Sequence, residues 1–148
     1  MKSILDKKTR DELIIRINSL NENSTAQWGK MKIYQMLKHC TLWEDMIFGN
    51  KKFKRVFMGR LFGSLALKSV LKNDTPLRRS TPTISELIVK EINGNIEAEK
   101  KKWIRMIEDY ENFSNFDFIH PFFGKMTKEQ IGYFVYKHTD HHLRQFNS

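Results

Sequence analysis

The sequence contains little cysteine, little proline and no long apolar run. Its single cysteine, Cys40, excludes an internal disulfide and a zinc site built from several thiolates. Its three prolines all lie where a helical pattern stops, so proline interrupts none of the helical segments. No apolar stretch approaches the ~20 residues that span a bilayer, and the first residues lack the apolar core of a signal peptide. We therefore expect a soluble, cytoplasmic protein.

The composition is typical of a globular chain. Of its 148 residues 40% are hydrophobic and 12% aromatic, enough for one domain over residues 1–148 with its own core. Apolar residues recur at spacings of three and four over long stretches, and no convincing run of alternating strand residues occurs. We predict an all-α fold, an antiparallel four-helix bundle with an extra basic helical insertion.

Helix boundaries follow from the periodicity and from capping sequences. Thr9-x-x-Glu12 and Thr127-x-x-Gln130 are predicted capping boxes at two helix starts, and Thr83-x-x-Glu86 is predicted to cap a short helix. The four long helices are expected at residues 9–20, 32–48, 96–113 and from 127 onward. In the last helix Ile131, Phe134, Val135, His138 and His142 form one inward stripe.

The net charge of +9 is concentrated in one segment. Residues 51–79 carry nine basic residues against one acid, Asp74; the nine are Lys51, Lys52, Lys54, Arg55, Arg60, Lys68, Lys72, Arg78 and Arg79. We treat residues 51–83 as a basic insertion and connection, with a helix from about residue 53 to 71 that can break near Gly63.

This basic helix is expected to pack its apolar side and to leave a solvated charged face. The predicted packed residues are Phe53, Phe57, Leu61, Leu65 and Val70. Two alternatives are an amphipathic helix on an anionic membrane and an electrostatic nucleic-acid site. No recognised nucleic-acid module accompanies the charge, and we expect neither nucleic acid nor a membrane as a partner.

Three of the five histidines lie within five residues, at His138, His141 and His142. His138 and His142 stand at i, i+4, which places two side chains on one helix face roughly 6 Å apart. Two buried neutral imidazoles need partners for their ring nitrogens, and a shared metal ion is a partner for one nitrogen of each ring. The alternative is a pair of partly exposed histidines at a helix end, where imidazolium suits the helix dipole; for an isolated pair this is the more frequent case.

A third ligand is available in the second predicted helix. His39 lies beside the inward residues Met36 and Trp43, and it meets the other two if this helix packs against the last one. A metal ion with three imidazole ligands and an open fourth coordination position is typical of catalytic sites, because water or substrate can bind at the open position. On its own, His39 would more often be a hydrogen-bonded core histidine.

Four stretches resemble the DinB-like (damage-inducible B) metalloprotein superfamily, and specifically one of its uncharacterised bacterial branches. They are Trp28-Gly-Lys-Met31, Gln35-Met-Leu-Lys-His-Cys40, His120-Pro-Phe-Phe-Gly124 and His138-x-x-His-His-x-x-Gln145. The resemblance implies a four-helix bundle in which the second helix gives one histidine ligand and the last helix an HxxxH pair. By position these are His39, His138 and His142, whereas His141 has no ligand counterpart. The usual His-Arg-Gly-Gln ending is His142-Leu-Arg-Gln145 here.

The same resemblance implies one divalent metal ion and a small-molecule substrate. Some relatives resemble thiol S-transferases and thiol-dependent isomerases, so a low-molecular-weight thiol is one expected substrate and hydrolysis is another expected reaction. Three imidazoles suit Zn, Ni, Fe or Co. Homodimers occur in the superfamily. A non-catalytic metal- or ligand-binding protein is the alternative function.

Five further residues are predicted beside the ligands or around a pocket: His141, His120, Gln35, Glu44 and Trp43. Each has a structural alternative, which is a hydrogen bond for His120, packing for Trp43 and a solvated helix charge for Glu44. Cys40 adjoins a predicted ligand, but successive helix positions diverge by about 100°, so we expect a small core residue.

Overall fold

Apolar residues at helical spacing form four long helices in a computed structural model that describes residues 1–148. These are α1 (Lys7–Ser19), α2 (Ile33–Ile47), α4 (Ile96–Asp109) and α5 (Lys128–Gln145). The shorter elements are α3 (Phe57–Val70), the 3₁₀ turns η1 (Ser85–Leu87) and η2 (Tyr110–Asn112), and the strands β1 (Ile119–His120) and β2 (Gly124–Lys125). The protein is therefore mostly helical.

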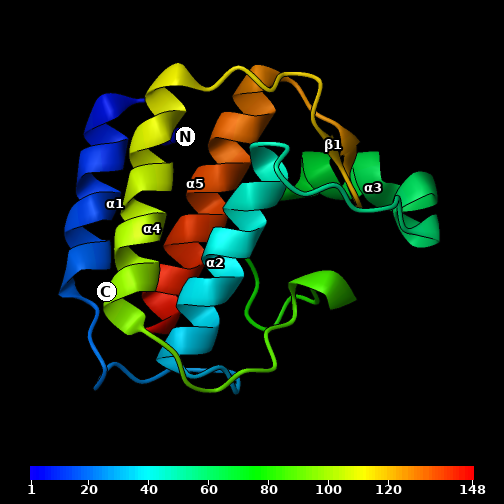
Figure 1. Cartoon of the computed structure of the whole chain (residues 1–148). Helices are drawn as coiled ribbons and strands as arrows, with labels where there is room; N and C mark the ends of the chain where they lie inside the picture. The colour runs from blue at the N-terminus through cyan, green and yellow to red at the C-terminus, as the bar shows by residue number, and fades with distance from the viewer.

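The four long helices lie side by side (Figure 1). Helix α4 packs against α1 and α2, and α5 contacts α1 and α2. Helices α1 and α5 run in one direction and α2 and α4 in the other (Figure 1). The long connection between α2 and α4 returns the chain to the end at which α2 began, so these two neighbours run parallel (Figure 1). The predicted antiparallel arrangement therefore does not hold for this pair. This arrangement places the middle of α2 against the C-terminal half of α5.

Apolar side chains from all four helices form the core. Leu13 and Ile17 of α1, Met36 of α2 and Trp103 of α4 are at most 1% exposed. Burial of a side chain of this size contributes about 1.5–3 kcal/mol each. The predicted inward stripe of α5 is confirmed, since all five of its residues are buried.

One predicted capping box is confirmed and two are wrong. Thr127 Oγ1 accepts from the Gln130 backbone N–H at 3.2 Å, and Gln130 Oε1 accepts from the Thr127 N–H at 2.9 Å. Helix α1 begins earlier than predicted, with Asp6 as its N-cap, so Thr9 is a buried residue inside the helix. The short helix after residue 83 is a single 3₁₀ turn without a capping side chain.

The all-α prediction misses a small hairpin. Strands β1 and β2 pair antiparallel, with Ile119 opposite Lys125 and His120 opposite Gly124. Gly124 has a φ of +86°, a conformation that disfavours any side chain. Strands of two residues are too short for an alternating pattern to be visible in the sequence.

Helix α3 itself packs with the side opposite to the predicted one. Its buried residues are Gly59, Gly63 and Leu67, whereas Phe57, Leu61 and Leu65 are exposed. Phe53 before the helix and Val70 at its end are half-buried against the core, so the prediction holds for these two residues only. A Cβ atom at Gly59 or Gly63 would lie 2.4 or 2.1 Å from the backbone oxygen of Phe122. The two glycines thus let the helix rest directly on the turn between β1 and β2, and the helix continues unbroken through Gly63.

Charged side chains hold both ends of this segment. Arg55 Nε donates to the Pro121 carbonyl at 3.1 Å, and an Arg55 terminal nitrogen donates to the Gly59 carbonyl at 3.0 Å. At the other end Lys137 Nζ of α5 donates to three backbone carbonyls, those of Val70, Asn73 and Thr75, at 2.6–2.9 Å. These hydrogen bonds fix the position of α3 relative to α5.

Replacement of Gly63 by alanine tests this packing. Alanine has the higher intrinsic helix propensity, by about 1 kcal/mol, yet its methyl group collides with the Phe122 backbone, so we expect the packing of α3 to weaken by about 1–3 kcal/mol. Hydrogen exchange of the α3 amides measures the loss of protection. Ser64→Ala, at an exposed position of the same helix, is the control and should change protection little; equal protection in G63A and S64A would contradict the packing.

Candidate metal centre

Three histidines from two helices converge in the core. His39 lies in the middle of α2, and His138 and His142 lie one turn apart on α5. One ring nitrogen from each comes within 4.8 Å of the others. The ring centroids are 4.7 to 5.4 Å apart, and the three side chains are only 5 to 8% exposed. The structure therefore brings together the three predicted ligands.

Two of the rings have a tautomer fixed by their neighbours. His39 Nδ1 lies 2.9 Å from the Leu87 carbonyl oxygen, which can only accept, so this nitrogen carries the proton. His142 Nδ1 lies 3.0 Å from Gln145 Oε1, and the amide nitrogen of Gln145 donates to the Trp28 carbonyl at 2.9 Å. Each ring therefore keeps the lone pair of its Nε2 free, which is the arrangement found in metal-ligating histidines.

The third ring is held by stacking. His138 lies on the indole of Trp43 with centroids 4.0 Å apart and ring planes within 10°. Its Nδ1 is buried and has no hydrogen-bond partner. A buried polar ring without a partner is costly, and an ion shared with His39 and His142 would give this ring a partner. Trp43, one of the residues predicted around the site, thus lies directly against His138.

All three imidazoles are neutral at physiological pH. Burial lowers the pKa of His39, and burial followed by repulsion from neighbouring histidines lowers the pKa of His138 and His142 well below the ordinary value. The neutral imidazole is the form that binds a metal ion. Three buried neutral nitrogen donors, two of them oriented by oxygen acceptors, fit a divalent ion with one open position.

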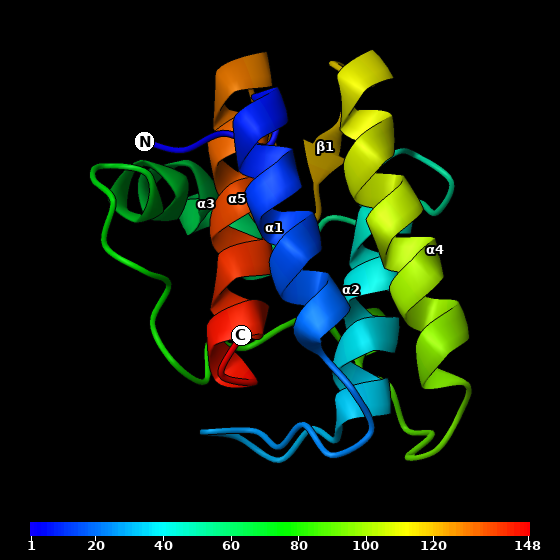
Figure 2. The same ribbon diagram turned by 90° about the vertical axis from the view of Figure 1, so that its left-hand side faces the viewer.

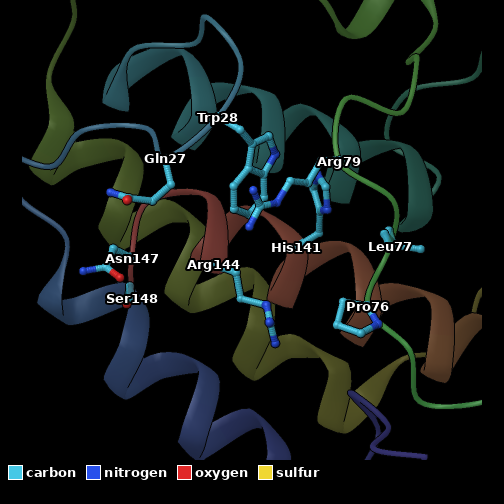
Figure 3. Close-up of a pocket in the computed structure, with 9 residues that line it drawn as sticks. All are labelled: Gln27, Trp28, Pro76, Leu77, Arg79, His141, Arg144, Asn147 and Ser148. Carbon is cyan, nitrogen blue, oxygen red and sulfur yellow. The ribbon is translucent and has the colours of Figure 1, made fainter.

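A cavity of about 420 Å³ adjoins His141, the residue before His142 on α5 (Figure 3). His141 lines this cavity together with Trp28, Arg79 and Arg144. The His141 ring lies 5.5 Å from the Trp28 ring and 5.1 Å from the His142 ring, so His141 contacts both the cavity wall and a candidate ligand. The Arg79 guanidinium stands 4.5 Å above the Trp28 ring. His141 is thus a pocket residue and not a fourth member of the cluster.

Gln35 and His120 have structural roles. Gln35 Oε1 accepts from the Lys32 N–H at 3.0 Å, and its amide nitrogen donates to the Val89 carbonyl at 2.9 Å, near the Leu87 carbonyl that orients His39. His120 Nδ1 accepts from the backbone N–H groups of Phe122 and Phe123 at 3.1 and 3.2 Å. Burial lowers the pKa of His120 to about 3. His120 therefore stabilises the turn on which α3 rests.

Glu44 points into a different part of the core. It stands five residues after His39, which corresponds to a rotation of about 140° around the helix. Its side chain is 0% exposed and accepts a short hydrogen bond from the Tyr110 hydroxyl of η2. Burial raises the pKa of Glu44 to about 8, although the bond from Tyr110 lowers it in part. Cys40 is also fully buried, as expected of a core residue.

Sequence reasoning missed two groups that orient the ligands. Gln145 lies three residues after His142 on α5, and this i, i+3 spacing is a signal that was available in the sequence. Residue 29, which contacts Gln145, is a glycine with a φ of +80°, a conformation that disfavours any side chain; a Cβ atom there would lie 3.0 Å from the Gln145 amide nitrogen. The Leu87 carbonyl is a backbone group in a 3₁₀ turn, and no side-chain pattern reveals it.

The family comparison covers nearly the whole chain. The model described as "Protein of unknown function (DUF1569)" matches residues 2–148. The match therefore includes all three histidines and the basic segment. No curated protein and no solved structure matches the chain.

The buried carboxyl of Glu44 predicts a specific pH dependence of stability. Between the ordinary pKa of a glutamate and about 8, the unfolded chain has lost this proton while the folded protein keeps it. The group therefore stabilises the fold least at high pH: we expect Glu44 to lower the free energy of unfolding by up to about 1.4 kcal/mol per pH unit as pH rises over this range.

Denaturant unfolding of metal-free protein from pH 5 to 8 measures this effect. Glu44→Gln should remove the part of the slope that Glu44 contributes, so its stability falls less with rising pH than that of the wild type, while the amide oxygen still accepts from Tyr110. The buried histidines, whose lowered pKa values act in the opposite direction, are common to both proteins and do not affect the comparison. Glu108→Gln, an exposed change of equal charge on α4, is the matched control and should keep the slope. Parallel pH profiles for wild type and E44Q would show that Glu44 is already ionised in the folded protein.

The fixed tautomers predict an NMR signature. His39 and His142 should be neutral at about pH 7.5 with the proton on Nδ1, since burial lowers both pKa values below the ordinary value and an oxygen acceptor faces each Nδ1. Long-range ¹H–¹⁵N spectra of the metal-free protein distinguish the two neutral tautomers and imidazolium. A proton on Nε2 of either ring would contradict the proposed donor set.

Proposed function

We propose that this chain, which belongs to the DUF1569 family, binds one divalent metal ion through His39, His138 and His142 and uses it in chemistry on a small molecule. The single observation that carries the proposal is the cluster of three buried, neutral imidazoles within 4.8 Å of one another. A core histidine ordinarily satisfies both ring nitrogens with protein groups. In this cluster His138 lacks a partner for its Nδ1, and two neighbouring rings present free lone pairs.

The resemblance to the DinB-like superfamily supports the same donor set. In such a four-helix bundle the second helix gives one ligand and the last helix an HxxxH pair, which corresponds to the positions of the three histidines here. A divalent ion held by them would supply Lewis-acid chemistry to a water, a thiol or a carbonyl group. Zn, Ni, Fe and Co all suit three imidazoles.

The residues around the cluster supply orientation and a dry environment. Gln145 and the Leu87 carbonyl fix two rings, and Trp43 supports the third by stacking. The low exposure of all three histidines keeps the cluster largely shielded from solvent. Side chains held in position in this way favour catalysis at a metal ion, because the protein then needs no reorganisation during the reaction.

The adjoining cavity supports an anionic small molecule as substrate. Arg79 and Arg144 line it, and neither forms an ion pair within the chain. Guanidinium groups bind carboxylates and phosphates by paired hydrogen bonds. A low-molecular-weight thiol that carries a carboxylate is one substrate of this class, and the reaction is then a thiol transfer; hydrolysis of an anionic ester is the other.

The second candidate function is metal or ligand binding without turnover. The observation that favours it is that none of the three histidines lines the cavity. His141 lines the cavity and contacts His142, so it lies between the cavity and the cluster. Substrate-dependent turnover by metal-loaded protein, lost when the metal is removed, distinguishes the enzyme from the binder.

Metal analysis of protein purified without a histidine tag tests the site. We expect one equivalent of a divalent metal in the wild type and none in the His138→Ala/His142→Ala double variant, because two of three ligands are lost. His141→Ala is the matched control on the same helix and should retain the metal. Stoichiometric metal in the double variant would refute the assignment of these ligands.

Gln145 tests the orientation of the donor set. Gln145→Leu removes the acceptor for His142 Nδ1, and loss of such a partner weakens metal affinity by about 10–100-fold. Competition with a chromogenic chelator measures the affinity. Gln130→Leu, at the other end of α5, is the control, since its amide only caps the helix; an unchanged affinity in Q145L would mean that His142 does not bind the metal through Nε2.

A further inference from the structure

Helix α3 presents an unusual number of apolar side chains to solvent. Phe57, Met58, Leu61, Phe62 and Leu65 are 71, 53, 56, 51 and 65% exposed, and we refer to these five residues as the α3 apolar face. They occupy positions i, i+1, i+4, i+5 and i+8. At about 100° per residue these positions fall within one continuous arc of about 140°. The five residues therefore form one surface and are not scattered.

The packing of α3 fixes this face outward. The opposite side of the helix carries Gly59, Gly63 and Leu67, and the two glycines rest on the Phe122 backbone with no room for a side chain. A rotation that buried the apolar face would place large side chains where only glycine fits. Figures 1 and 2 show that α3 projects from the side of the four long helices, so the face is presented by a fixed and protruding element.

The surroundings of the face are strongly positive. Residues 51–73 contain seven basic residues and no acidic one; the seven are Lys51, Lys52, Lys54, Arg55, Arg60, Lys68 and Lys72. All of them except Arg55 are exposed, and Arg60 and Lys68 belong to α3 itself. An exposed apolar arc flanked by lysine and arginine is the pattern of a helix that lies in the plane of a membrane interface.

The positive charge around the α3 apolar face distinguishes between the partners that could cover it. A second copy of the chain would bring two of these basic segments together across a twofold axis, and like charges would oppose the contact. Nucleic acid would pair with the lysines but would leave the five apolar side chains in water. A bilayer with anionic lipids matches both features, because its head groups bind the lysines and its acyl chains accommodate the apolar side chains.

We propose that α3 docks the protein on an anionic lipid surface, with the α3 apolar face inserted at the boundary of head groups and acyl chains. No helix of the structure is long and apolar enough to cross a bilayer. The proposal does not depend on the metal centre, because the two features belong to different elements. Protein stripped of metal by a chelator is therefore expected to bind lipid as the metal-loaded protein does, and failure of one proposal leaves the other in place.

Sedimentation with vesicles tests the proposal on the full-length protein. We expect binding to vesicles that contain phosphatidylserine, and binding weaker by about tenfold or more to vesicles of phosphatidylcholine alone or at high salt. Leu61→Ser/Leu65→Ser should weaken binding by about tenfold or more, because the two exposed leucines supply much of the inserted apolar surface and their loss does not affect the core. Ile15→Ser/Ile92→Ser, a pair of equally exposed apolar residues outside α3, is the matched control and should bind as wild type.

Charge and insertion are tested separately. Lys51→Gln/Lys52→Gln/Lys54→Gln should weaken binding by about fivefold for each lysine while the apolar face stays intact. Three results would overturn the proposal: no binding to phosphatidylserine vesicles, full binding by L61S/L65S, or a wild-type dimer in analytical ultracentrifugation that L61S/L65S dissociates while vesicles are not bound. Tight binding of nucleic acid with no affinity for vesicles would likewise assign the basic segment to another partner.

Discussion

The contact between α2 and α5 depends on three imidazoles that must be neutral where they lie. Desolvation lowers the pKa of each ring, and the rings repel one another when charged, so this contact favours histidines that hold no extra proton. The neutral state in turn requires acceptors for the ring N–H groups. The Leu87 carbonyl in a 3₁₀ turn and the Gln145 side chain at the end of α5 provide such acceptors for His39 and His142.

Much of the remaining chain holds these two helices in place. The amide of Gln35 fixes the segment that carries the Leu87 carbonyl, and Gln145 links α5 to the Trp28 loop. The basic segment between α2 and α4 is attached differently, through glycine contacts and the backbone carbonyls that bind Arg55 and Lys137. The protein thus combines a tightly packed region that carries the candidate metal centre with a separately anchored helix that exposes its apolar side.

Features of the fold that depend on residues close in sequence were predictable, and features that depend on residues far apart in sequence were not. The helices and the stripe of α5 were predictable because repeats of three and four and the Thr127–Gln130 box are local signals. The start of α1 was missed because the segment before it is fixed by a long-range bond, from the Ile4 N–H to the Gly132 carbonyl on α5. The orientation of α3 was missed for a related reason: apolar periodicity identifies the larger apolar side but does not tell which side a partner will contact.

The sequence by itself determined the helices, the i, i+4 pair on the last helix and the histidine on the second helix that could join it. Local spacing alone contains this information, because side chains three or four residues apart must share a helix face. The tertiary structure decided that α2 meets α5, that Gln145 and a backbone carbonyl fix the ring tautomers, and that Glu44 faces Tyr110 and not the cluster. It also decided that α3 turns its glycines inward, since the close approach of two backbones depends on a turn about 60 residues away in the chain and on space that only folding creates.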